Sequence, residues 1–181
     1  MGRLRFRSLT LGAALFLLAP GLAMARGGGG PGRPFGLGLQ VGSPTGLSGK
    51  YYLGGGAAMQ FGVGEAFGHG DGLHVNLEAL FHPVILARVP AFTLPFYLGV
   101  GGRILFHDDY RHDNHYHDDD VHVGLRAPFG LLMDFNRVPM DLFLELALVI
   151  DLVDLDDEDD YDGDHEDRTD LNAAIGFRYY F

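Results

Sequence analysis

The sequence has 181 residues, of which 47% are hydrophobic and 20% charged, with 28 glycines and no cysteine. That length suits one domain, which excludes a multidomain enzyme, and the composition is too apolar for a disordered chain. The lack of cysteine excludes a disulfide framework, a thiolate metal site and a cysteine nucleophile.

The beginning of the chain has the pattern of an export signal. Three arginines within the first seven residues precede the apolar run Leu9 to Leu22, and Ala23-Met24-Ala25 forms a small-x-small cleavage site. The run is shorter than the roughly 20 apolar residues that a spanning helix needs. We therefore expect a cleaved signal peptide over residues 1–25, a Gly/Pro-rich tether over 26–34 and one domain over 35–181.

Acidic residues are concentrated in two segments. The formal net charge is −11, and removal of the three signal arginines takes it to −14. Asp108 to Asp120 holds six aspartates, and Asp154 to Arg168 holds ten acidic residues, so the rest of the mature chain is neutral. A polyphosphate partner needs a basic face, so we expect no nucleic-acid partner.

Apolar residues alternate with small or polar ones in eight segments, which predicts strands. In Leu73 to Phe81, for example, apolar side chains alternate with His74, Asn76 and Glu78. The longer segments reach the ~9–11 residues with which a tilted strand crosses a bilayer, and the others come within one or two residues of that length. The segments cover residues 35–42, 47–53, 57–64, 73–81, 94–101, 121–130, 142–150 and 171–181.

The alternation places the apolar residues of each strand in one row and the small or polar residues in another, on opposite faces of the sheet. The composition of these two rows indicates which face meets lipid. A soluble sheet would carry many lysines and glutamates on its polar row, whereas this row holds mainly glycine, alanine, glutamine and asparagine. Small residues with a few charges suit the filled lumen of a narrow barrel, and the apolar row then faces lipid. The sequence predicts an all-β, eight-stranded antiparallel up-and-down transmembrane β-barrel that is monomeric in outer-membrane lipid.

The connections agree with that prediction. If the chain starts in the periplasm, both acidic segments fall on the external side, and the connections at residues 54–56 and 136–139 are short inner turns. The third inner connection, Pro83 to Thr93, is longer. It either prolongs a strand or lies at the membrane interface, and the sequence leaves both alternatives open.

The carboxyl end carries the most specific resemblance. Ile175, Phe177, Tyr179 and Phe181 alternate up to the last residue, which resembles the signal that the barrel-assembly machinery recognises. The chain from Phe35 to Phe181 resembles the small outer-membrane barrels of Gram-negative bacteria, the OmpA- and OmpX-like group. Residues 36–52 also resemble short exported barrel families of unassigned function. The resemblance implies an outer-membrane location and names no active site.

Six charged residues are expected to point into the lumen. They could line an ion path, which would make the protein a narrow pore, or form a salt-bridge network that fills the barrel. The narrow lumen of an eight-stranded barrel favours the network. The six residues are Lys50, Glu78, Arg103, Arg126, Glu145 and Arg178.

The segment around Asp108 to Asp120 is a candidate metal site, because imidazole and carboxylate together suit zinc, nickel or copper. In an extended backbone, His115 and His117 share one face. The alternative is a solvated loop, since the segment lacks a fixed metal-site spacing. The candidate ligands are His107, His112, His115, His117, Asp118, Asp119 and Asp120.

Other motifs fail. With Gly163 at the sixth position of a calcium loop, the twelfth is Thr169 instead of glutamate, so only loose calcium association is expected. Ser48, His74 and Glu78 could form a hydrolytic group, but no nucleophile motif accompanies them. We expect no resident cofactor and no enzyme. The predicted function is a non-enzymatic barrel with an envelope-structural, adhesive or surface-binding role; the alternatives are divalent-metal binding and a narrow pore.

Overall fold

The computed structural model describes residues 33–65, 72–108, 119–154 and 169–181. The predicted signal peptide and most of the two acidic segments therefore lie outside the described residues. All regular structure in the described part is strand. No helix in this part is long and apolar enough to cross a membrane.

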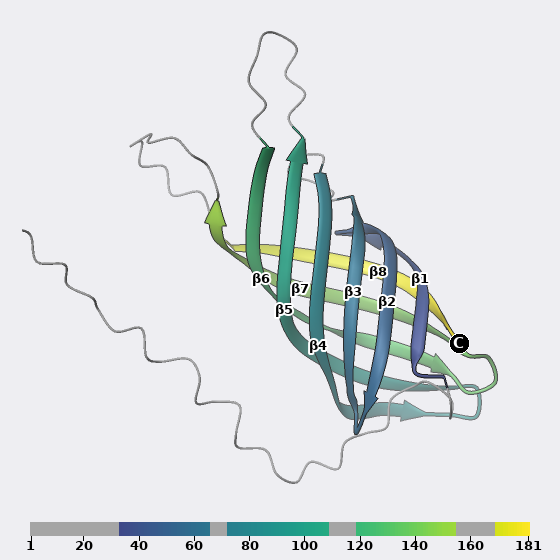
Figure 1. The fold of residues 1–181 in the computed structure, drawn as a ribbon. Helices are drawn as coiled ribbons and strands as arrows, with labels where there is room; N and C mark the ends of the chain where they lie inside the picture. Colours follow the sequence, from purple (N-terminus) through teal and green to yellow (C-terminus); the bar gives the residue numbers. More distant parts are fainter. Residues whose placement is uncertain (1–32, 66–71, 109–118, 155–168) are drawn as a thin grey trace, which may run out of the picture.

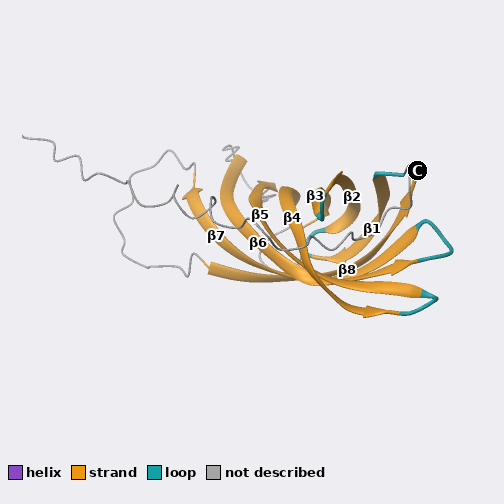
Figure 2. Ribbon diagram, turned by 90° about the horizontal axis from the view of Figure 1, so that it is seen from below, coloured by secondary structure: helices purple, strands orange, loops and turns teal. Residues whose placement is uncertain are grey.

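Eight antiparallel strands pair in chain order, and β1 pairs with β8 to close a barrel (Figures 1 and 2). The predicted fold class is confirmed. The alternating pattern explains why each segment forms a strand, because each presents one row to the lumen and one to the outside. The strands are β1 (Phe35–Gly42), β2 (Thr45–Gly54), β3 (Ala57–Glu65), β4 (Gly72–Arg88), β5 (Phe92–Asp108), β6 (Asp119–Phe135), β7 (Met140–Asp154) and β8 (Thr169–Tyr180).

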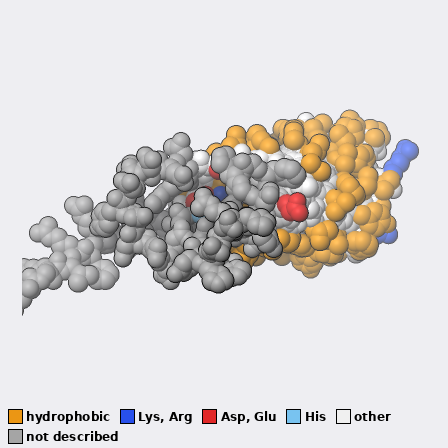
Figure 3. Space-filling model, turned by 90° about the horizontal axis from the view of Figure 1, so that it is seen from above, with side chains coloured by type: hydrophobic (Ala, Val, Ile, Leu, Met, Phe, Trp, Pro, Cys, Tyr) orange, Lys and Arg blue, Asp and Glu red, His pale blue; other side chains and the backbone are white. Residues whose placement is uncertain are grey.

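The apolar row faces outward along every strand. On β7, the side chains of Leu144 and Leu146 are 52% and 37% exposed, whereas Glu145 between them is 3% exposed. On the face drawn in Figure 3, hydrophobic side chains correspondingly cover most of the visible wall. This is the reverse of a soluble barrel, in which the apolar row is the buried one.

One end of the barrel, here called the turn end, holds three short connections. The β2–β3 turn uses Gly55 and Gly56 at positive φ, a region that glycine adopts at little cost. The open question about Pro83 to Thr93 is answered by longer strands: β4 continues to Arg88 and β5 begins at Phe92. The ladder there shifts register twice, which disrupts the simple alternation.

The opposite end, here called the loop end, holds the other four connections, of which residues 43–44 are described. The interior is not uniform from one end to the other. Towards the turn end, a cluster of apolar and aromatic side chains lies beside the buried Asp141–Arg178 pair, with Tyr52 packed against the cluster. This apolar plug consists of Ala58, Leu80, Tyr97, Leu132 and Phe143.

Candidate functional site: the polar lumen

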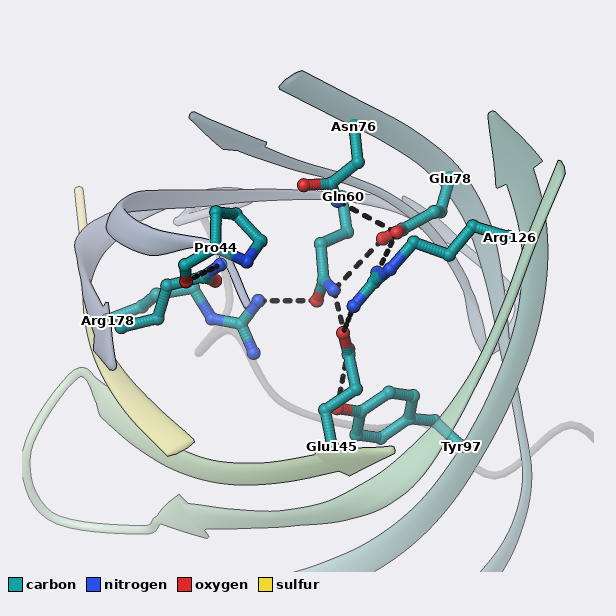
Figure 4. Close-up of polar contacts among 9 residues, drawn as sticks. Pro44, Gln60, Asn76, Glu78, Tyr97, Arg126, Glu145 and Arg178 are labelled. Carbon is teal, nitrogen blue, oxygen red and sulfur yellow. Dashed lines mark hydrogen bonds and ion pairs between the residues drawn. The ribbon is translucent and has the colours of Figure 1, made fainter. Parts of the chain in front are cut away.

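A three-residue ion cluster lies inside the barrel. Arg126 on β6 donates to Glu78 on β4 and, at 2.8 Å, to Glu145 on β7. All three side chains are 3% exposed or less. A buried charge is tolerated only when it is paired and hydrogen-bonded, and here one guanidinium serves two carboxylates (Figure 4).

Neutral side chains complete the hydrogen bonding of the two glutamates. Gln60 donates from Nε2 to both Glu145 (2.7 Å) and Glu78 (3.1 Å). Asn76 donates to Glu78 at 2.8 Å, and the Tyr97 hydroxyl donates to Glu145 at 2.9 Å. The carboxylates are thereby held from several directions in the lumen (Figure 4).

A second buried pair joins this cluster through Gln60. Arg178 on β8 donates from Nε to Asp141 on β7 at 3.1 Å and from Nη1 to the Gln60 amide oxygen at 2.7 Å. The Tyr180 hydroxyl donates to the other Asp141 oxygen at 2.5 Å. The Arg178 guanidinium also lies 4.1 Å from the centre of the Phe143 ring, a cation–π contact with the apolar plug.

The fully buried Lys50 makes its hydrogen-bond contact with an imidazole. Its Nζ lies 2.9 Å from Nε2 of His82, whose Nδ1 donates to the Gly56 carbonyl at 2.9 Å. The Gly56 carbonyl can only accept, so Nε2 accepts from Lys50 when the imidazole is neutral. Lys50 Nζ also lies 4.9 Å and 5.3 Å from the ring centres of Tyr52 and Tyr97.

The fourth cation, Arg103, pairs with Asp151 nearer the loop end. Its Nη2 lies 2.7 Å from Asp151 Oδ2 and 2.9 Å from Oδ1. The Asp151 side chain is 26% exposed. Among the described residues, four basic side chains and four carboxylates make these contacts, and a fifth carboxylate, the half-buried Asp134 on β6, faces the same interior as the register partner of Asp141.

Inward-facing glycines create the room for these contacts. Gly101 on β5 is the register partner of both Glu78 and Arg126, so the two charges meet across a position without a side chain. A Cβ at Gly101 would lie 2.6 Å from Glu78 Cα. Gly124 lies in the same way between Arg103 and Asp151.

The side chain of Tyr97 reaches Glu145 across Gly130, in the same arrangement. A Cβ at Gly130 would lie 2.7 Å from the Tyr97 phenol ring. A glycine on the strand between two polar residues therefore leaves the space in which their side chains make contact.

Several buried polar atoms lack a hydrogen-bond partner among the described residues. They include Ser48 Oγ and both ring nitrogens of His74. Glu78 is occupied by Arg126 and the two amides. The structure therefore does not join Ser48, His74 and Glu78 into a hydrogen-bonded relay.

The structure places the other candidate residues as follows. All six lumen charges lie inside the barrel, where Arg103 and Arg178 pair with Asp151 and Asp141. Of the candidate metal ligands, residues 112–118 lie outside the described part, and no cluster of three metal-ligating side chains occurs within it. The four residues of the carboxyl-terminal signal point outward and are 42–64% exposed: Ile175, Phe177, Tyr179 and Phe181.

Sequence analysis missed Asp141 and Asp151, which lie one residue outside the expected ends of the β7 segment. A signal was present: both residues continue the inward row of Phe143, Glu145 and Val149 in steps of two. Sequence analysis also missed Gln60, Tyr97 and Tyr180 as hydrogen-bond partners of the buried charges. The alternating pattern indicates to which face a side chain points, but not which side chains come into contact.

No family model and no curated protein matches the chain. Among solved structures, it is similar to the N-terminal β-barrel domain of Pseudomonas aeruginosa OprF, with a TM-score of 0.49 and 17% identity over 81% of this chain and 94% of that chain. The fold itself rests on the strand pairing described above. The chain is a closed, eight-stranded antiparallel β-barrel.

Proposed function

We propose that this protein is a non-catalytic structural barrel of the outer membrane whose lumen does not conduct ions. The observation that carries the proposal is the composition of the interior, which holds a network of buried, hydrogen-bonded charges together with the apolar plug. Arg126, Arg178, Tyr97 and Tyr180 are among the largest fully buried side chains. They occupy the space that a pore would need.

The outward surface supports the membrane part of the proposal. Exposed leucine, valine, isoleucine or phenylalanine occurs on seven of the eight strands, and the outward row of β3 (Ala57, Met59, Phe61 and Val63) is half-exposed. Closure of the sheet satisfies the strand hydrogen bonds, as a lipid environment demands. The predicted signal peptide supports export, and the acidic connections would then face the outside of a Gram-negative cell, where they suit a surface-binding role.

The interior argues against a pore. An ion entering the lumen would have to displace groups that already satisfy one another, such as Arg126 between its two glutamates. It would also have to pass the apolar plug, whose mainly hydrocarbon side chains replace little of its hydration shell. The paired network therefore favours a structural role over conduction.

The test is reconstitution of the refolded protein into lipid vesicles. Heat-dependent gel migration and protease protection report whether the barrel inserts, and potassium flux reports whether it conducts. The proposal predicts an inserted, protease-protected barrel that leaves vesicle permeability unchanged. A protein that stays in the aqueous fraction, or one that inserts and conducts, would contradict it.

Divalent-metal capture is the second candidate. The β5–β6 ladder makes His107 the register partner of Asp120 and Asp108 the partner of Asp119, which supports convergence of the adjoining segment. Zinc titration calorimetry of the intact barrel and of a variant with residues 109–118 replaced by an Asn-Gly turn tests it. Saturable binding that disappears in the variant is expected. Heats that are weak, reduced by salt and equal in both proteins would refute it.

A further inference from the structure

Exposed charges in the described part are segregated by sign. The exposed acidic side chains, Glu65 and Asp170, lie where β3 ends and β8 begins, at the loop end. The exposed basic side chains are Arg33, Arg88 and Arg137, all at the turn end. The remaining described basic residues are buried in the lumen.

Two of these arginines belong to a repeated turn. Arg88-Val89-Pro90 ends β4, and Arg137-Val138-Pro139 connects β6 to β7. In each copy the arginine is exposed, and the following valine is 40% and 47% exposed. Each turn therefore presents a cation next to an apolar side chain.

Three hydrogen bonds hold the two turns together. The Asn136 side chain donates to the Val89 carbonyl at 2.8 Å, and its backbone N–H donates to the Ala91 carbonyl at 3.1 Å. Thr93 Oγ1 donates to Asn136 Oδ1 at 3.3 Å. Arg88 and Arg137 are each next in sequence to a residue of the 2.8 Å bond, so the paired turns form one surface with two cations.

The paired turns adjoin the lipid-facing wall. On β4, the exposed Val84 and Leu86 lead directly to Arg88 and Val89. An arginine at such a boundary can place its guanidinium at the headgroup level while its alkyl stem covers apolar surface. A guanidinium also offers two parallel donors that match a phosphate group.

We propose that the paired Arg-Val-Pro turns bind an anionic phospholipid of the adjacent leaflet, with Arg88 and Arg137 on its phosphate and Val89 and Val138 beside its acyl chains. The inference rests on the proposed membrane function, which places these turns at a leaflet surface. Charge complementarity and continuity with the apolar wall favour a lipid over a soluble protein partner. The acidic loop end offers no comparable site among its described residues.

The test is native mass spectrometry of the refolded full chain with phosphatidylglycerol and phosphatidylcholine of the same acyl composition. Wild type is expected to retain phosphatidylglycerol in preference. Each arginine near an anionic lipid surface is worth about fivefold, so the double variant Arg88→Gln/Arg137→Gln should weaken retention about 25-fold. Arg33→Gln removes the same charge outside the paired turns and should have little effect.

Asn136→Ala separates a built site from diffuse charge, because it loosens the paired turns without changing the net charge. We expect it to weaken retention as well. Equal retention of the two lipids, a loss in Arg33→Gln as large as in either turn variant, or an unchanged Asn136→Ala would each overturn the inference. A barrel that fails to insert into vesicles refutes the proposed function instead, whereas an inserted barrel without lipid preference refutes this inference alone.

Discussion

Replacement of Gly101 by alanine is expected to destabilise the barrel, because this position separates Glu78 from Arg126. The added Cβ would lie 2.6 Å from Glu78 Cα and would also press on the Leu77 carbonyl, so backbone atoms would have to move. Overpacking of this kind costs about 1–3 kcal/mol. Breaking a buried ion pair adds up to about 3–5 kcal/mol.

Glycine-to-alanine replacement also lowers the entropy of the unfolded chain, which offsets about 0.4–1 kcal/mol. We expect the free energy of unfolding to fall by about 3 kcal/mol in Gly101→Ala. The neighbouring Gly102 supplies a matched control, since it faces outward and a Cβ there would meet only the Gly124 carbonyl oxygen, at 3.6 Å. Gly102→Ala should change the stability by less than about 1 kcal/mol.

Urea titration of the refolded protein in detergent micelles measures both variants. The chain has no tryptophan, so far-UV circular dichroism and heat-dependent gel migration are the suitable probes. The comparison refutes the reasoning if Gly101→Ala and Gly102→Ala unfold at the same urea concentration. It would mean that the absence of a side chain at Gly101 does not hold the ion cluster together.

Three further outcomes are expected. Arg126→Met leaves two buried carboxylates without their cation and should lower the free energy of unfolding by about 3–5 kcal/mol in the same titration. Asp141→Asn keeps the shape but weakens the contacts with Arg178 and Tyr180, and should cost about 1–3 kcal/mol. Replacement of residues 109–118 by an Asn-Gly turn should leave the urea midpoint unchanged while abolishing saturable zinc binding in calorimetry, because the two residues still close the hairpin between the paired Asp108 and Asp119.

The wall of the barrel was predictable because one physical rule governs it. Successive side chains of a strand point to opposite faces. Within Leu73 to Phe81, apolar residues therefore form one row, and His74, Asn76 and Glu78 belong to the other. This alternation predicts both the strand and the face that each row occupies. The same rule failed between Pro83 and Thr93, where two register shifts disrupt the alternation. Most predicted strands were also shorter than the strands of the structure.

The interior was predictable only in part. The sequence indicated that Lys50 points inward, but its partner His82 is 32 positions away and outside the expected segment. The hydrogen bond from Arg178 to Gln60 spans 118 positions, and it depends on the tilt and register of the closed barrel. The alternation of side chains along a strand contains no information about that tilt and register. Which inward charges pair with one another therefore became known only from the structure.

Single-channel recording in planar bilayers tests the closed lumen most directly. The protein is inserted under conditions in which the protease-protection assay demonstrates insertion. Wild type is expected to give no conductance steps, because Arg126, its two glutamates and the apolar plug occupy the lumen that the described strands enclose. Reproducible steps from the inserted wild-type protein would contradict the closed lumen and establish a pore.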